Sequence, residues 1–123
     1  MRRKSEPEDL SQFLPLTPTV FDILLALWEC ERHGYGIMRE VRRESEGRVI
    51  LRPGTLYRAL SRLEDMGFLE ESEMRPDPEL DDERRRYYRL TGLGKRVLKA
   101  EAQRLAHQVH AARAKKLIQG RAG

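Results

Sequence analysis

The side chains best suited to binding an anionic partner lie on one face of the segment Pro53–Met66. At 100° per residue, Tyr57, Arg58 and Ser61 fall together on a polar side, and Arg62 lies at its edge. Hydroxyl and guanidinium groups donate hydrogen bonds to phosphate oxygens, and arginine also pairs with the acceptor edge of guanine. These residues predict a nucleic-acid contact. The alternative interpretation is an ordinary solvated helix face.

No catalytic or metal-binding set accompanies these residues in the sequence. No Ser or Cys has a His and an acid in a sequence context that would make it a nucleophile. His107 and His110 are three residues apart, but no thiol or carboxylate nearby completes a metal site. Cys30 and His33 make only half of one, since no second pair follows. We therefore expect no enzymatic activity, no cofactor and no metal.

Composition agrees with a small intracellular domain that binds polyanions. The formal net charge is +4 and the isoelectric point is about 9.5, which is compatible with neutralising phosphates. The single cysteine, Cys30, excludes an intramolecular disulfide and suits a reducing cytosol; beside Trp28, it is expected to be buried. The longest apolar run, Ile23–Trp28, is far too short to cross a bilayer. We expect a soluble, cytoplasmic protein.

The polar face needs a scaffold, and the sequence pattern predicts one. Hydrophobic periodicity, capping residues and turn residues indicate helices from Thr17-Pro18 to a point before His33, over Tyr35–Ser45, over Pro53–Met66, and from Thr91 towards Gln119. A short strand is predicted at Val49–Leu51, and a hairpin pairs 69–74 with 84–90.

This order predicts a mainly α fold with a small β-hairpin, an α+β winged helix-turn-helix, in which one helix can enter the DNA major groove. Residues 1–16 form an N-terminal tail that could become a short helix or lie on a partner subunit. Residues 17–92 form the winged-helix domain, and 93–119 a C-terminal dimerisation helix packed with it as one structural unit.

Charge is divided along the hairpin. The expected tip carries five acids and its C-terminal base four arginines: Asp77, Glu79, Asp81, Asp82 and Glu83, then Arg84, Arg85, Arg86 and Arg89. An acidic tip would repel DNA phosphates, so wing contacts are expected from the base, at Arg85 and Arg86. Neutralisation of the acids by these arginines is an equally weighted alternative.

The last helix carries a heptad-like apolar seam. Its residues are spaced four, three, four and three apart: Leu98, Ala102, Leu105, Val109 and Ala112. So small a domain offers this seam no further internal partner. We therefore expect a homodimer whose interface uses Leu98, Ala102, Leu105 and Val109.

Four stretches of the sequence resemble PadR-type transcriptional regulators. Each combines turn glycines with aromatic or apolar residues, and together they cover most of residues 17–94 in the family's order: His33–Ile37, Pro53–Leu60, Leu63–Leu69 and Arg86–Gly94. The resemblance implies a homodimeric winged-helix repressor on an inverted-repeat operator, dimerising through its N-terminal and single C-terminal helices. It also implies DNA contacts at Tyr35, Thr55, Tyr57, Arg58 and the wing arginines. The chain departs from the family by Arg52, which stands where a capping Ser or Thr is common, and by its acidic wing tip.

Two further interpretations stay open at this point. Trp28, on a first helix expected to be buried, is either core packing or the wall of a pocket for a small hydrophobic or aromatic effector. The whole domain is either a sequence-specific DNA-binding regulator or a winged helix used as a protein-interaction module, because fold does not fix function. Steep salt dependence of duplex binding separates these two functions.

Overall fold

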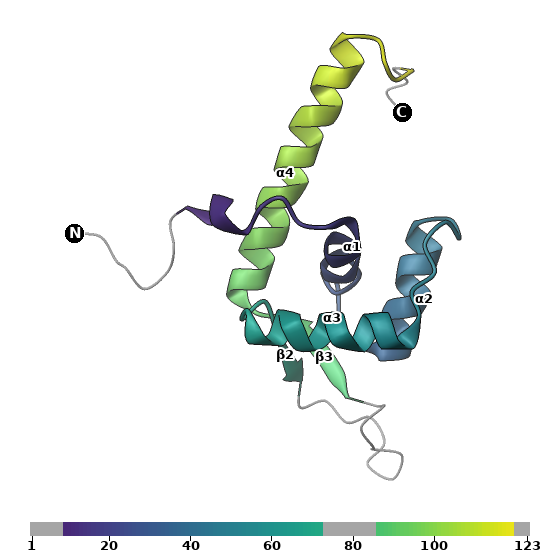
Figure 1. Ribbon diagram of the computed structural model, residues 1–123, viewed down its shortest axis with the longest axis vertical. Coiled ribbons are helices and arrows are strands. Elements are labelled where there is room, and N and C mark those ends of the chain that lie inside the picture. The colour runs from purple at the N-terminus through teal and green to yellow at the C-terminus, as the bar shows by residue number, and fades with distance from the viewer. Residues whose placement is uncertain (1–8, 73–85, 120–123) are drawn as a thin grey trace, which may run out of the picture.

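The computed structural model describes residues 9–72 and 86–119, which form a helical domain with one small sheet (Figure 1). The sequence predicted this winged-helix order of helices and hairpin. The elements, in chain order, are η1 (Leu10–Phe13), α1 (Pro18–Ala26), β1 (Arg32–His33), α2 (Gly34–Glu44), α3 (Pro53–Asp65), β2 (Leu69–Ser72), β3 (Tyr87–Leu90) and α4 (Gly92–Ala114).

Three of the four α-helices begin at a side chain that caps their first turn. Thr17 accepts a hydrogen bond from the Val20 N–H, His33 Nδ1 from Gly36, and Thr91 from Gly94. These bonds satisfy backbone donors that a helix start leaves unpaired. Helix α3 has no such bond at Arg52 and begins with proline at its first position instead.

The sheet is antiparallel in the order β1-β3-β2, and its first strand was not predicted. Leu69 pairs with Leu90 and Ser72 with Tyr87 in the hairpin, while Arg32 and His33 pair with the other edge of β3. The strand predicted at Val49–Leu51 is wrong. That segment is an irregular connection between α2 and α3, in which Leu51 packs into the core and Ile50 is exposed.

The core lies where the three winged-helix helices meet the sheet and the start of α4. Its fully buried side chains include Ile23, Leu24, Ile37, Leu56, Leu60, Phe68 and Val97. Gly94 is required at the junction between α4 and the hairpin, because a Cβ there would collide with the Phe68 carbonyl oxygen. The Thr91 N–H donates to the same oxygen at 3.0 Å, so α4 is fastened to the wing.

The segment before α1 packs on the domain. The Phe13 and Phe68 rings meet edge to face, with centroids 5.3 Å apart. The Leu16 N–H donates to Glu101 Oε2 at 3.1 Å, which attaches this segment to α4. Residues 9–16 of the predicted tail therefore form a short 3-10 helix and an extended strap across α4 (Figure 1).

Three burial predictions are corrected by the structure. Helix α1 ends at Ala26, so Trp28 lies beyond it and is 44% exposed rather than buried. Cys30 follows in the same turn and is also exposed. Leu98, predicted to face a partner, is 3% exposed and belongs to the protomer's own core. Within the described residues, no helix has both the length and the apolar character needed to cross a membrane.

Candidate nucleic-acid interface

Helix α3 presents one buried and one open face. Leu56, Leu60 and Leu63 are at most 1% exposed and anchor the helix to the core. Four residues on the other side of the helix are exposed: Thr55, Arg58, Ser61 and Arg62. This division follows from the helical period of the apolar residues, and it places four predicted site residues on one open surface.

The two arginines of this surface are available to an external partner. Within residues 9–72 and 86–119, no carboxylate pairs with the guanidinium of Arg58 or Arg62. A guanidinium offers up to five N–H donors in a rigid plane, which suits bidentate contact with guanine or phosphate. The open face of α3 therefore carries hydrogen-bond donors that can pair with acceptor atoms of duplex DNA.

Tyr57 is placed differently from its neighbours on α3. It is half-buried, and its hydroxyl end lies against the start of α2, where a Cβ on Gly34 would overlap the phenol. The sequence predicted Tyr57 as a direct DNA contact. Its ring also makes a contact within the protein, against Gly34 of α2, and its contact with DNA stays a prediction.

Tyr35 lies in the first turn of α2 and is 58% exposed. It borders a groove of about 420 Å³ between α2 and the connection to α3, lined by Tyr35, Met38, Arg39, Arg42, Ile50, Leu51 and Pro53. Because Pro53 is the first residue of α3, the groove continues from the open face of that helix. The sequence interpretation included Tyr35 but missed Arg39 and Arg42.

At the base of the wing, the described arginines are held by carboxylates. Arg86 Nη1 lies 3.2 Å from Glu71, and Arg89 Nε donates to Glu70 at 2.9 Å. Arg89 also lies 3.6 Å from Glu31, which accepts a 2.5 Å hydrogen bond from Ser72 Oγ. Among the described residues, Arg86 and Arg89 thus lie beside the carboxylates of Glu71, Glu70 and Glu31.

The carboxylates at the wing base could have been found from strand pairing. In the hairpin register Glu70 faces Arg89 and Glu71 faces Tyr88, and cross-strand neighbours of opposite charge attract. Glu31 gives no such signal, because it reaches the wing from the loop after α1. Arg84, Arg85 and the acids Asp77, Glu79, Asp81, Asp82 and Glu83 lie outside the described residues.

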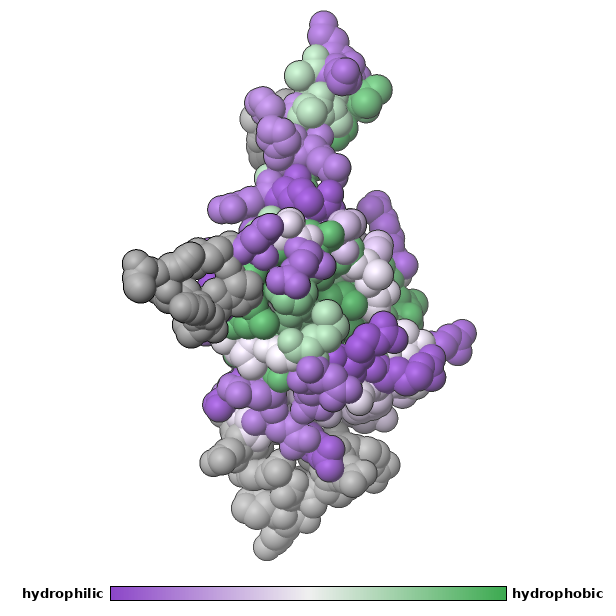
Figure 2. All heavy atoms as spheres, turned by 60° about the vertical axis from the view of Figure 1, so that its left-hand side comes forward, coloured by the Kyte–Doolittle hydropathy of each residue, from purple (hydrophilic) through white to green (hydrophobic). Residues whose placement is uncertain are grey.

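The predicted seam of α4 divides into a buried and an open part. Leu98 packs inside the protomer, Leu105 and Ala112 are half-buried, and Ala102 and Val109 are exposed. Figure 1 shows this second half of α4 projecting beyond the other helices. Figure 2 shows hydrophobic residues beside hydrophilic ones on the projecting part. The part of the seam that is not buried within the protomer therefore begins after Glu101.

Comparison with known proteins identifies relatives of this arrangement. The family described as "Transcriptional regulator PadR-like family" matches residues 23–100. A PadR family transcription regulator from Clostridium difficile is 31% identical, over 76% of this chain and 95% of that one, with a TM-score of 0.60. A transcriptional regulator from Clostridium thermocellum is 25% identical, over 81% and 92% of the two chains, with a TM-score of 0.62.

A further similar structure is Bacillus subtilis PadR in complex with operator DNA, with a TM-score of 0.58. It is 24% identical over 70% of this chain, which spans 47% of that protein's length, and this likeness shows the shared fold. The comparison with curated proteins gave no significant match.

Proposed function

This chain belongs to the PadR-like family of transcriptional regulators, and from that premise we propose that it is a sequence-specific DNA-binding repressor. It acts as a homodimer on an inverted-repeat operator, with α3 in the major groove of each half-site. The proposal extends to this chain the partner of Bacillus subtilis PadR, which was solved with operator DNA.

The observation that carries this proposal is the open face of α3. Its exposed donors, Thr55, Arg58 and Ser61 among them, stand opposite a row of leucines that fixes the helix in the core. A helix held rigidly on one side and polar on the other can enter a major groove about 12 Å wide without disturbing its own packing. Side chains on a rigid element also keep the orientation that base recognition requires.

Dimerisation is proposed through the part of α4 beyond Glu101. Ala102, Leu105, Val109 and Ala112 continue the apolar face that Leu98 begins inside the protomer. A second copy of the same helix would cover these residues and bring two α3 helices to one duplex. A dimer with two-fold symmetry reads an operator with matching symmetry.

Release by a small hydrophobic or aromatic effector is the remaining part of the proposal. Trp28 is 44% exposed in the protomer and lies directly after α1. Its indole can therefore contribute to a pocket that the second subunit completes. A flat aromatic wall of this kind is common in sites for planar ligands.

The recognition surface is tested by truncating its arginines one at a time. We expect Arg58→Ala and Arg62→Ala each to weaken binding to a duplex selected from a random pool by about 1–3 kcal/mol, if each arginine pairs with a guanine. The measurement is an equilibrium titration by fluorescence anisotropy at fixed salt.

Arg113→Ala is the matched control, because Arg113 is exposed near the far end of α4. It removes the same charge at a distance from α3, so its affinity should stay close to that of the original protein. If both α3 variants bind as tightly as the control, with their folding intact, α3 is not the recognition helix.

A further inference from the structure

The wing hairpin, formed by β2 and β3, is joined to the helices through a very short strand. Strand β1 has two residues, pairs with β3 on one side and continues directly into α2 at Gly34. Strands in globular proteins usually have three to ten residues, so this ladder offers few backbone hydrogen bonds. The position of the hairpin relative to the helices therefore depends on side-chain contacts at and beside β1.

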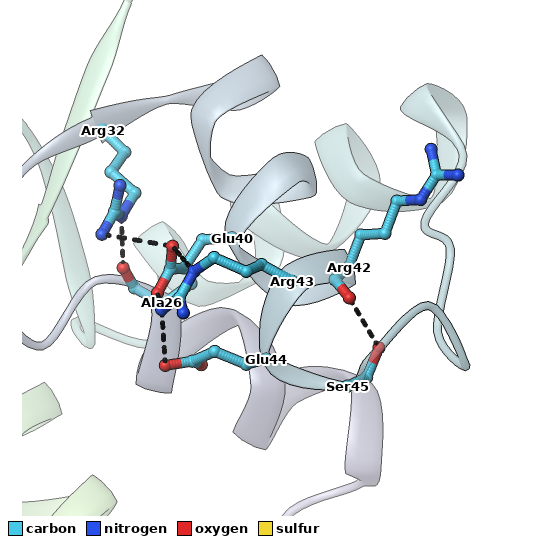
Figure 3. Close-up of polar contacts among 7 residues, drawn as sticks. All are labelled: Ala26, Arg32, Glu40, Arg42, Arg43, Glu44 and Ser45. Atoms are coloured by element: carbon cyan, nitrogen blue, oxygen red, sulfur yellow. Dashed lines mark hydrogen bonds and ion pairs between the residues drawn. The ribbon is translucent and has the colours of Figure 1, made fainter.

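Arg32, the first residue of β1, attaches this strand to the helices (Figure 3). Its Nε donates to the Ala26 carbonyl, at the end of α1, at 2.7 Å, and its Nη2 lies 3.7 Å from Glu40 of α2. Glu40 is buried and accepts two further hydrogen bonds, both from Arg43. The carbonyl at a helix end and a buried carboxylate both need such donors. Strand β1 is thus bound to α1 and α2.

Glu31, the residue before Arg32, contacts the wing instead. Its Oε1 accepts a 2.5 Å hydrogen bond from Ser72 Oγ of β2, and its Oε2 lies 3.6 Å from Arg89 Nη1 of β3. Strand β3 lies between β1 and β2 in the sheet, so the carboxylate reaches past the middle strand. One side chain from the loop after α1 therefore contacts both strands of the hairpin.

His33, the second residue of β1, contacts both parts of the domain. Its Nδ1 accepts a hydrogen bond from the Gly36 N–H at 3.0 Å, which caps α2. Its ring meets the Tyr87 ring of β3 edge to face, with centroids 5.3 Å apart. Three consecutive residues thus carry contacts to the helices, to the wing, or to both.

The contacts of Glu31 differ from the other ion pair of Arg89. Arg89 Nε donates to Glu70 at 2.9 Å, and this pair joins β3 to β2 within the hairpin itself. Arg89 and Glu70 are both exposed, whereas Ser72 is buried and Glu31 is half-buried. A hydrogen bond to a charged group is stronger where water is excluded. Glu31 therefore provides a more shielded contact, and one that connects the hairpin to the rest of the domain.

We propose that Glu31 is a positioning residue that fixes the angle of the wing hairpin to α2 and α3. The inference rests on the proposed function, because the fixed angle lets the hairpin and the open face of α3 meet one duplex together. A loosely held hairpin would lose conformational freedom on binding, and that loss opposes association. Glu31 thereby raises the affinity for DNA without contacting it.

The first measurement is amide hydrogen exchange on the full chain without DNA. Glu31→Ala removes both acceptor oxygens and should raise the exchange of the β1 amide protons that pair with β3 by about tenfold or more. Glu31→Gln keeps an acceptor for Ser72 and should give a smaller rise. Ser72→Ala should act in the same direction and add little in the double variant with Glu31→Ala, since the two side chains share one hydrogen bond.

Glu70→Ala is the matched control. It removes a carboxylate from the same Arg89, but from within the hairpin, so separation of β1 from β3 leaves the lost contact unaffected. The β1 amides should therefore exchange as in the original protein. Unchanged β1 exchange in Glu31→Ala, or an equal rise in Glu70→Ala, would overturn the positioning role.

The second measurement is binding to a duplex selected from a random pool. Glu31→Ala should select the same bases as the original protein, because α3 is intact, but bind about two- to tenfold more weakly. Hydroxyl-radical protection should decrease outside the base pairs that α3 reads. Equal affinity and an equal footprint, with β1 exchange raised, would overturn the inference and leave the proposed function intact. Absence of DNA binding by the original protein would instead refute the proposed function.

Discussion

Single residues at the junction of α2 and α3 decide how α3 is held against the domain. Gly34 opens α2, and the phenol of Tyr57 occupies the space that any side chain at position 34 would need. The sequence showed both residues within motifs but not this contact, because the two positions are 23 residues apart and meet only in three dimensions. The exposed face of α3 was predictable, since the period of Leu56, Leu60 and Leu63 defines it.

We predict that Gly34→Ala destabilises the protein by about 1–3 kcal/mol, because the added methyl group meets a rigid, half-buried ring. Gly54→Ala is the matched control: the nearest atom to its new Cβ is the flexible end of Arg58, 3.6 Å away. That control should be neutral or stabilising by up to about 1 kcal/mol, as alanine favours helix over glycine. Urea denaturation measures both changes.

A double-mutant cycle isolates the contact. In a Tyr57→Ala background the ring is gone, so Gly34→Ala should cost at least about 1 kcal/mol less than in the original protein. Equal costs in the two backgrounds would show that Gly34 is required for a reason other than Tyr57.

At the scale of elements, one buried carboxylate connects the N-terminal strap to α4. Glu101 is 1% exposed, receives two hydrogen bonds from Arg104, at 2.6 and 2.9 Å, and one from the Leu16 N–H. The Arg104 guanidinium is the main cause that lowers the pKa of Glu101. A lowered pKa in the folded state means that the ionised carboxylate stabilises the fold above the ordinary glutamate pKa, about 4.3.

We therefore predict that Glu101→Gln lowers the free energy of unfolding by about 1–3 kcal/mol at neutral pH, where a charged hydrogen-bond partner is lost. The difference from the original protein should shrink as the pH falls from about 5 towards 3, because the unfolded chain binds a proton near the ordinary glutamate pKa of about 4.3, before the folded Glu101, whose pKa is lowered, does so. Urea denaturation at several pH values measures this difference. A difference that stays constant over that range would show that the charge of Glu101 does not contribute.

Helices were more predictable than strands in this chain, for physical reasons. Thr17-Pro18 and Thr91-Gly92 carry local signals for helix starts, and the structure confirms both. The strand predicted at Val49–Leu51 was wrong because a short β-branched run also occurs in irregular connections, where here only Leu51 is buried. Strand β1 consists only of Arg32 and His33, whose pairing depends on the edge of β3 and leaves no pattern in the sequence.

For the whole molecule, the arrangement of α4 supports the proposed homodimer. Helix α4 is 23 residues long. Among the residues that the structure describes, Glu101 is the last one of this helix that is buried. Beyond Glu101 the helix keeps the half-buried Leu105 and the exposed Val109 on the face that Leu98 begins. The sequence predicted this seam. It placed Leu98 on the wrong side of the boundary because spacing alone does not show where the protomer's core ends.

The central claim is that two copies of this chain read a symmetric DNA site. It is tested most directly by selecting bound duplexes from a random pool with the original protein and with Leu105→Asp in parallel. The original protein should enrich an inverted repeat whose half-site centres are about one helical turn, 10–10.5 base pairs, or a multiple of it apart. Leu105→Asp places a charge in the seam, so it should recover single half-sites or nothing. Absence of any enriched sequence with the original protein, or recovery of the same inverted repeat by Leu105→Asp, would contradict the account.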